Sequence, residues 1–498
     1  VSITTGSLEV LNGAVVDATT FGKGNAGNVD ITANDLVKID GETNQGKNSG
    51  AFSQVLFNAV GKAGGVSITT GSLEVTNGAE VAASTFGNGN AGSVEIRATD
   101  LVKFDGESRN RSDSGAYSRV NSEAEGDAGG VSITTGSLEV LNGALLSAST
   151  FGKGNAGTVE ITANDLVKFD GEGNDRFPSG AYSRVNSGAE GSEGGVLITT
   201  GSLEVLNGAV VDATTLGKGN GGNLTVNTDT LQLKNDGIIV ARSRSDSGIA
   251  GNIEIKVKNN FNADNGQVIT SSERTSGGNI DITGKNIILR NDSDISTTLD
   301  STQGSGGNIT LNANAIVALE DSDILAFAAE GRGGNIIFNT RAFFSEPLFS
   351  SRPQNAEPLT AQELNQLEGN ERVDVDASGS ISSGTITGQT DPGFLQNSFT
   401  QLPQNQINTE TLIASSCVAR NNKRNGTYYI IGSQAFPYSP GDPVPSKYSA
   451  IGVQSVPNNT TSSTKPRRRW KMGDPVVEPT GMYTLENGRR ILSRECGT

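Results

Sequence analysis

The sequence predicts an all-β chain wound as a parallel β-helix, and three observations support that prediction. A stretch of the form VSITTGSLEVLNGA begins at Val1, Val66, Val131 and Val196, so it returns every 65 residues. Apolar and polar residues alternate within it, which is the pattern of a strand with one buried face. Gly, Asn, Asp and Ser separate the alternating runs and supply the positive φ angles that sharp corners need. A strict period indicates a repeat architecture in which each unit packs mainly on its neighbours.

Each 65-residue unit divides into two coils. A glycine turn leads into a second strand start, as in GNAGNVDI at Gly24–Ile31, and such starts continue to GGNIIF at Gly333. The first apolar residues of the starts stand at positions 1, 29, 66, 94, 131, 159, 196, 224, 253, 280, 309 and 336. We therefore predict a solenoid of about 12 coils of 27–29 residues, with 37 residues in alternate early coils. Parallel stacking at roughly 4.8 Å per coil gives a rod on the order of 55–60 Å long.

An Asn precedes the first apolar residue of many coils, and we expect these side chains to stack as an amide ladder. We also expect the amides to be buried, so that replacing one costs on the order of 1–3 kcal/mol. The residues of the expected ladder are Asn28, Asn223, Asn252, Asn279, Asn308 and Asn335.

Proline usage predicts a change of architecture near residue 340. Only Pro178 precedes residue 347, and the other 13 prolines follow it. We predict the β-helix over residues 1–340, an insertion with a terminal coil or cap over 341–390, and an irregular Pro-rich module over 391–498. The strand-like alternation that resumes at Val373–Asp376 supports the terminal coil.

Composition excludes some classes of function. The formal net charge is −16, and this argues against nucleic-acid binding, which needs clustered Lys and Arg. The sequence contains no run of 18 apolar residues, so it predicts no membrane-spanning helix. The chain opens inside a repeat without a signal peptide, so we interpret residue 1 as a cut end of a longer protein.

An enzyme on the same fold is the alternative function, because hydrolases and lyases of polysaccharides also use parallel β-helices. Such a site needs grouped acids with basic or His partners, and this chain has no His. Its repeated acids, at Asp40–Glu42, Asp105–Glu107 and Asp170–Glu172, recur every two coils. Identical repetition favours a surface ladder over an active site. We expect no catalytic residue and no enzymatic activity.

The long coils carry SGAFSQV or SGAYSRV, which repeats an aromatic ring, and in two of them an Arg, about 10 Å apart along the rod. Such rings could bind a glycan chain, with the Arg side chains hydrogen-bonding to it. The alternative, which we favour, is that each ring covers the base of its own loop. The residues concerned are Phe52, Tyr117, Arg119, Tyr182 and Arg184.

Two acidic turns suggest a weak calcium site. The sequences NDSD at Asn291 and EDSD at Glu320 begin 29 residues apart, so Asp292 and Asp294 should stack on Asp321 and Asp323. Carboxylates at about 5 Å repel unless solvent or a cation screens them, and Ca²⁺ suits such oxygens. The alternative is a solvated corner. No other cofactor or metal is expected.

The last part of the chain holds both cysteines, Cys417 and Cys496. If the protein is exported, a single disulfide between them is the simplest pairing, whereas in a reducing compartment they stay thiols. Two distant cysteines without His make a zinc site very unfavourable. The basic patch Lys465–Lys471 either meets an acidic surface or is a solvated linker.

The GGNI coil starts, the NG corner and the GKGNAG corner resemble filamentous-haemagglutinin-type exoproteins of two-partner secretion. The likeness is greatest to the cyanobacterial branch of S-layer or haemagglutination-activity-domain proteins. The tail block LIASSCVARNNKRNGTYYIIG at Leu412–Gly432 is also similar to that branch. The resemblance implies a right-handed β-helix, export through an outer-membrane partner pore, and adhesion to surface glycans or other cells. Some adhesins of the class also close a C-terminal loop with a cysteine pair, which Cys417 and Cys496 could match.

The family's N-terminal secretion domain is missing from this sequence, so export is implied by the resemblance alone. We expect a secreted or cell-surface filamentous adhesin or structural exoprotein, associated with the outer membrane and built on a β-helical stalk. A polysaccharide lyase or hydrolase on a parallel β-helix is the alternative.

Overall fold

The computed structural model describes residues 1–345 except 175, 193, 246–247 and 300–303, then 350–351 and 370–388. Near the C-terminus it describes 454–455, 481–484, 488 and 490–493. All regular elements among these residues are β-strands, and none of these residues forms a helix that could span a membrane. The chain divides into two units, Val1–Phe394 and Leu395–Thr498.

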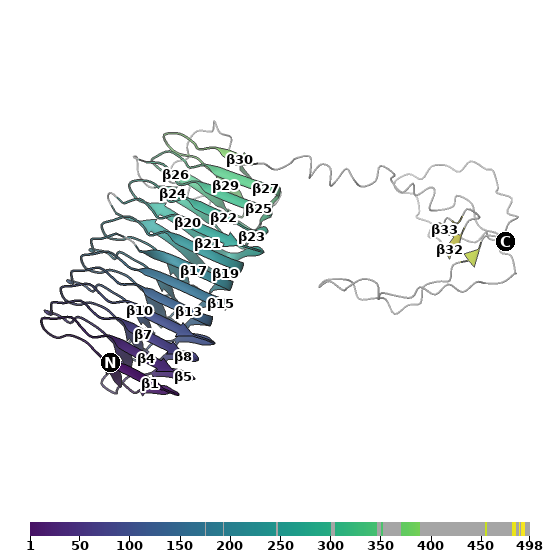
Figure 1. Cartoon of the computed structure of the whole chain (residues 1–498). Helices are drawn as coiled ribbons and strands as arrows, with labels where there is room; N and C mark the ends of the chain where they lie inside the picture. The colour runs from purple at the N-terminus through teal and green to yellow at the C-terminus, as the bar shows by residue number, and fades with distance from the viewer. Residues whose placement is uncertain are drawn as a thin grey trace, which may run out of the picture. The chain divides into compact units, whose positions relative to one another are not determined.

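The first unit is a parallel β-solenoid of about 12 turns, which confirms the predicted all-β, parallel fold (Figure 1). Each turn contributes three strand segments. In the first turn these are β1 (Ser2–Thr5), β2 (Leu8–Leu11) and β3 (Val15–Asp17). They pair in parallel with the equivalent strands one turn later, because each turn repeats the alternation of the last.

The strands that follow β3 continue this order along the chain, and several run through more than one face of their turn. They are β4 (Val29–Ala33), β5 (Leu36–Asp40), β6 (Gly50–Phe52), β7 (Val66–Thr70), β8 (Ser72–Thr76), β9 (Glu80–Ala82), β10 (Val94–Ala98), β11 (Leu101–Asp105), β12 (Gly115–Tyr117), β13 (Val131–Leu141), β14 (Leu145–Ser147), β15 (Thr158–Asp170), β16 (Gly180–Tyr182), β17 (Gly195–Leu206), β18 (Val210–Asp212), β19 (Leu224–Ser243), β20 (Ile253–Val257), β21 (Asn260–Ser272), β22 (Ile280–Thr283), β23 (Asn286–Arg290), β24 (Ile295–Leu299), β25 (Ile309–Ala318), β26 (Ile324–Ala328), β27 (Ile336–Ser345), β28 (Ser350–Ser351), β29 (Asp374–Asp376) and β30 (Ile386–Gly388).

The stack continues beyond residue 340. Val375 of β29 pairs with Ile324 of β26, and Ile386 of β30 pairs with Ile336 of β27. Both pairings are parallel, so residues 374–388 add strands to the same solenoid. The described part of the first unit therefore ends at Gly388.

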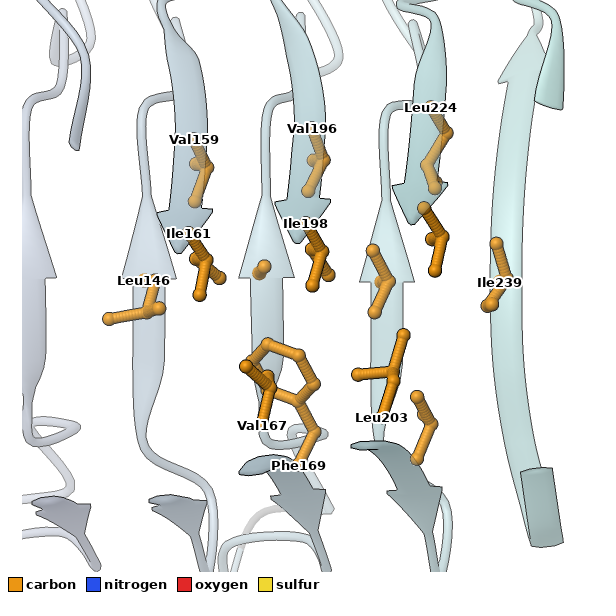
Figure 2. Close-up of a cluster of buried hydrophobic side chains, with 14 of the residues drawn as sticks. Leu146, Val159, Ile161, Val167, Phe169, Val196, Ile198, Leu203, Leu224 and Ile239 are labelled. Atoms are coloured by element: carbon orange, nitrogen blue, oxygen red, sulfur yellow. The ribbon is translucent and has the colours of Figure 1, made fainter. Parts of the chain in front are cut away.

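The interior is filled in layers, one layer per turn (Figure 2). The large side chain of Phe169 on β15 is fully buried, and the third strand of the same turn contributes only Ala181. The preceding turn combines Val140 with Leu146, both also fully buried. A large residue on one face is thus matched by a small one on another, which keeps each layer close-packed at constant cross-section.

Six of the nine extra residues of each long coil lie between its second and third strands and form a loop there. A buried serine ties each loop down: Ser179 Oγ accepts the Gly143 N–H at 2.8 Å and donates to the Asp170 carbonyl at 2.9 Å. Glu107 Oε1 accepts the N–H of Asn174 in the loop two turns later. Successive loops are therefore joined along the rod.

The described part of the second unit is a small sheet of β31 (Gln454–Ser455), β32 (Gly481–Thr484) and β33 (Arg490–Ser493). β31 runs parallel to β32, and β32 runs antiparallel to β33. Cys417, Cys496, the patch Lys465–Lys471 and the block Leu412–Gly432 lie outside the described residues.

Candidate ligand-binding surface

The third face of the solenoid carries the aromatic residues that we considered for glycan binding. In each third strand the middle residue points inward and its two neighbours point outward. Tyr117 and Tyr182 are nevertheless only 4% and 2% exposed, and Phe52 is half-buried. The two tyrosine rings are too buried to offer a face to a glycan chain, while glycan binding by Phe52, Arg119 or Arg184 stays a prediction.

The tyrosines hold their own loops instead, as in the alternative that we favoured. Tyr117 Oη donates to the Asp113 carbonyl at 2.7 Å, and Tyr182 Oη donates to the Pro178 carbonyl at 2.6 Å. Burial raises the pKa of the Tyr182 phenol well above its ordinary value, so the phenol stays a hydrogen-bond donor. Each ring is a clamp for the loop four residues upstream.

The glycine of the SGAY sequence makes room for the ring. A Cβ on Gly115 would lie 2.5 Å from the Tyr117 hydroxyl and 2.2 Å from the Leu145 carbonyl oxygen. Any side chain here would displace both the ring and the next strand. The pairing of Gly with an aromatic two residues later is the sequence signal for a ring lying along its own strand.

The arginines that follow the rings stack on them. The Cζ atom of Arg119 lies 3.9 Å from the centroid of the Tyr117 ring, and that of Arg184 lies 4.4 Å from the Tyr182 centroid. Both distances fall within the range of cation–π contacts. These guanidinium groups help to cover the rings.

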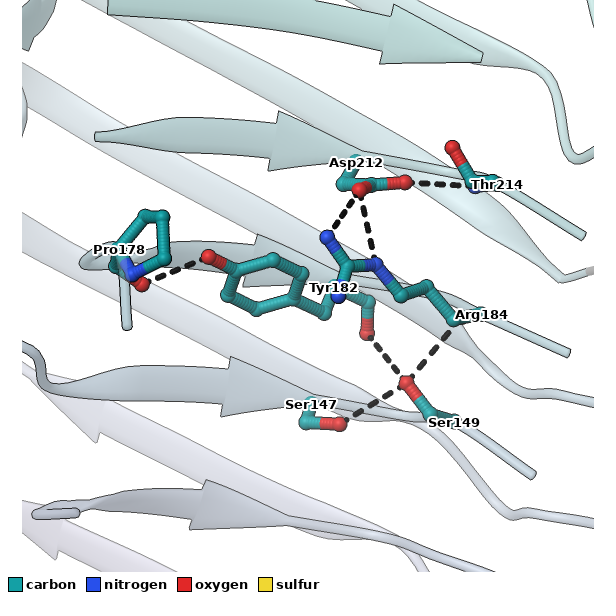
Figure 3. Close-up of polar contacts among 7 residues, drawn as sticks. All are labelled: Ser147, Ser149, Pro178, Tyr182, Arg184, Asp212 and Thr214. Carbon is teal, nitrogen blue, oxygen red and sulfur yellow. Dashed lines mark hydrogen bonds and ion pairs between the residues drawn. The ribbon is translucent and has the colours of Figure 1, made fainter. Parts of the chain in front are cut away.

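Arg184 also forms an ion pair with the next turn (Figure 3). Its Nε donates to Asp212 Oδ2 at 2.8 Å, and its Nη2 pairs with the same oxygen. Asp212 Oδ1 accepts the N–H of Thr214 at 2.7 Å. Burial disfavours the charge on Arg184, but Asp212 outweighs that effect and raises the pKa of the guanidinium. One carboxylate is thus held by a guanidinium fork and a backbone N–H.

A pocket of about 240 Å³ opens beside this ion pair. It spans three consecutive turns, and its polar lining is mainly arginine. The residues that line it are Arg184, Asp212, Thr214, Leu216, Val240, Arg242 and Arg244.

Arg242 is the least compensated charge in this pocket. Its Nε is buried and has no hydrogen-bond partner. Burial lowers the pKa of Arg242, and the nearby charges of Arg244 and Arg184 lower it further against the opposing effect of Asp212. Arg244 is more exposed, with its Nε 3.5 Å from Glu273 Oε1. The sequence indicated Arg184 but not the other two arginines, because the 65-residue period ends before they occur.

The acidic turns considered for calcium stack in the expected register. Asp292 and Asp321 lie in turns with positive φ, while Asp294 and Asp323 are buried beside the third strands. The Asp323 N–H donates to Asp294 Oδ1 at 3.0 Å, and the Asp374 N–H donates to Asp323 Oδ1 at 2.8 Å. These carboxylates therefore form a ladder with the backbone.

A proton can neutralise the centre of this ladder. Burial raises the pKa of Asp323 to about 9, opposed by the backbone N–H of Asp374 and reinforced by the carboxylates of Asp294 and Asp374. Across the described residues, no three Asp, Glu, Cys or His side chains are grouped to hold a metal ion. Calcium binding stays a prediction.

The asparagine ladder runs through the later turns. Asn308 N and Nδ2 both donate to Asn279 Oδ1, at 2.9 and 3.1 Å, and Asn335 repeats this on Asn308. Asn223 and Asn252 begin the same series. All five side chains lie on exposed residues, so the expected burial is wrong.

Asn28 stands apart from this series. Its Oδ1 accepts the Gly65 N–H at 3.0 Å, because the next turn has glycine at this position and offers no amide side chain.

The repeated acids at Asp40, Asp105 and Asp170 have structural partners. Asp105 Oδ1 accepts Asn142 Nδ2 at 2.8 Å, and Asp170 Oδ1 accepts Asn207 Nδ2 at 2.6 Å. Each carboxylate thus fixes the Asn-Gly corner of the next turn, where the Asn has positive φ.

Comparison with known proteins does not identify a family for this chain. No protein-family model matches the chain, and neither a curated protein nor a solved structure matches it.

Proposed function

We propose that this chain is the β-helical stalk of a secreted or cell-surface filamentous adhesin or structural exoprotein, exported by two-partner secretion. Its outer-membrane partner would be a transporter pore, and its targets would be surface glycans or other cells. The observation that best supports this proposal is the parallel stack of turns from β1 to β30. The resemblance to cyanobacterial haemagglutination-activity-domain proteins agrees with it.

The buried layers make the solenoid suitable as a stiff spacer. Residues in equivalent positions pair turn after turn, as Ile68 does with Ile96 and Ile96 with Ile133. Each turn contacts mainly its two neighbours, so length grows without a change in cross-section. A stalk needs this property, because it must hold a binding part away from its anchor.

The surface of the early turns repeats at two-turn spacing. Lys103 and Asp105 form an ion pair at 2.9 Å, and Lys168 and Asp170 repeat it at 2.8 Å. Equivalent groups lie about 10 Å apart along the rod. Many weak contacts at fixed spacing add up to firm attachment through multivalency.

A glycan-array screen of the full chain, paired with an assay for new reducing ends, tests this function. The proposal predicts binding to surface glycans or to whole cells without any cleavage. Release of reducing ends would replace it with the polysaccharide-processing enzyme. Absence of binding to both glycans and cells would contradict a role in adhesion.

A further inference from the structure

The arginine-lined pocket beside β18 and β19 departs from the repeat of the rod. At the equivalent place two turns earlier, Tyr117 pairs with Ser147, whereas Tyr182 pairs with Asp212. Arg184 therefore has a carboxylate to bind where Arg119 has none. The Arg184–Asp212 ion pair distinguishes this turn from the one two turns earlier, and the fold itself does not require it.

We propose that this pocket binds an oxyanion, namely the carboxylate or sulfate group of an acidic saccharide. Three guanidinium groups line it; Arg184 is paired with Asp212 and Arg244 with Glu273, outside the lining, which leaves Arg242 without a carboxylate partner among the described residues. The positive charges of Arg184 and Arg244 repel that of Arg242, and partial burial strengthens the repulsion. An oxyanion between Arg242 and Arg244 would relieve it.

The donors available suit an oxyanion better than a neutral ligand. Arg242 lines the pocket and its buried Nε has no hydrogen-bond partner, so its guanidinium has donor capacity left for an acceptor in the pocket. Guanidinium groups present donors in a planar fork that matches carboxylate and sulfate oxygens. Asp212, held by the Arg184 fork and the Thr214 N–H, shows this recognition within the same pocket.

The remaining walls suit a sugar ring. Leu216 and Val240 supply apolar surface next to the arginines. A cavity of about 240 Å³ is small for a drug-sized ligand but has room for one charged saccharide unit. The C–H face of a pyranose would lie on the apolar wall while its anionic group meets Arg242. The pocket would bind such a group whether or not the rod acts in adhesion.

Calorimetric titration of the full chain tests the site, with sodium glucuronate, sodium sulfate and neutral glucose at constant ionic strength. We expect saturable binding of at least one of the two anions and none of glucose. Tighter binding of glucuronate assigns the pocket to a uronic acid, and tighter binding of sulfate assigns it to a sulfate ester.

The variant Arg242→Gln should weaken anion binding about tenfold, because it removes one charge-assisted hydrogen bond. Arg244→Gln, at a more exposed position, provides a second test if the first variant melts early. Arg97→Gln is the matched control, since Arg97 is exposed and pairs only with Glu95 on its own strand. Equal affinity in Arg242→Gln and Arg97→Gln, or no saturable binding of either anion, would overturn the proposal.

Discussion

Replacing Asp323 by asparagine should stabilise the last turns of the solenoid at neutral and alkaline pH. The side chain is 2% exposed, and its pKa is raised from 3.8 to about 9 in the folded chain. Because the folded pKa exceeds the unfolded one, the stabilising contribution is complete below pH 3.8 and is lost as pH rises through about 9. At about 1.4 kcal/mol per pH unit, the loss reaches roughly 4 kcal/mol by pH 7.

Asparagine does not titrate, and it can keep the hydrogen bond that the Asp323 side chain accepts from the backbone. Its Oδ1 can still accept the Asp374 N–H that Asp323 accepts at 2.8 Å. The free energy of unfolding of Asp323→Asn should therefore change less with pH than that of the wild type, and should exceed it at pH 7 and above.

Hydrogen exchange followed by mass spectrometry, over peptides covering β25 and β26, measures the effect locally. This choice matters because a long repeat array does not unfold in one step. Asp229→Asn is the control, since it removes a surface carboxylate that pairs with Lys258 and lies several turns away from Asp323. Identical pH dependence of protection in the wild type and in Asp323→Asn would refute the argument.

Three further substitutions and one exposed control test the packing and the loop hydrogen bonds, with each cost measured as lost hydrogen-exchange protection in peptides of the substituted turn. Phe169→Ala should lower the free energy of unfolding by about 3–5 kcal/mol, because it leaves a cavity. The control Phe177→Ala, at a residue 41% exposed, should lower it by less than about 1 kcal/mol. Equal losses would contradict the layered core. Tyr182→Phe should cost about 1 kcal/mol, since the hydrogen bond to the Pro178 carbonyl is lost; unchanged protection of that loop would show that the hydrogen bond does not hold it. Asn308→Ala should cost about 0.5–1 kcal/mol, below the range for a buried amide; a larger loss would contradict the exposed ladder.

The period of the sequence was sufficient to predict the fold. Because VSITTGSLEV returns at a fixed interval, each strand could be aligned with its copy, and the pairing of Val29 with Val66 and of Val94 with Val131 follows that alignment. The volume match between Phe169 and Ala181 was not predictable in this way. It depends on which residues share one cross-section, and the length of each loop decides that.

The sites were harder to predict than the fold. Alternation places Tyr117 and Tyr182 on the outer side of their strands, but it cannot show that a loop and an arginine close over the rings. Predicting the pocket would have required the register of Arg184, Asp212 and Arg242, which lie on three turns with unlike sequences. No local motif joins these residues.

Deleting residues 66–130 tests most directly the central claim that the rod consists of interchangeable two-turn units. The cut joins Gly65 to Val131, which occupies the register position of Val66. The account predicts a folded chain with a similar melting temperature and a rod about 10 Å shorter by electron microscopy. Deletion of residues 66–98 is the control, because it breaks the register and should unfold the adjoining turns. If the 65-residue deletion unfolds the rod as badly as the control, the claim is contradicted.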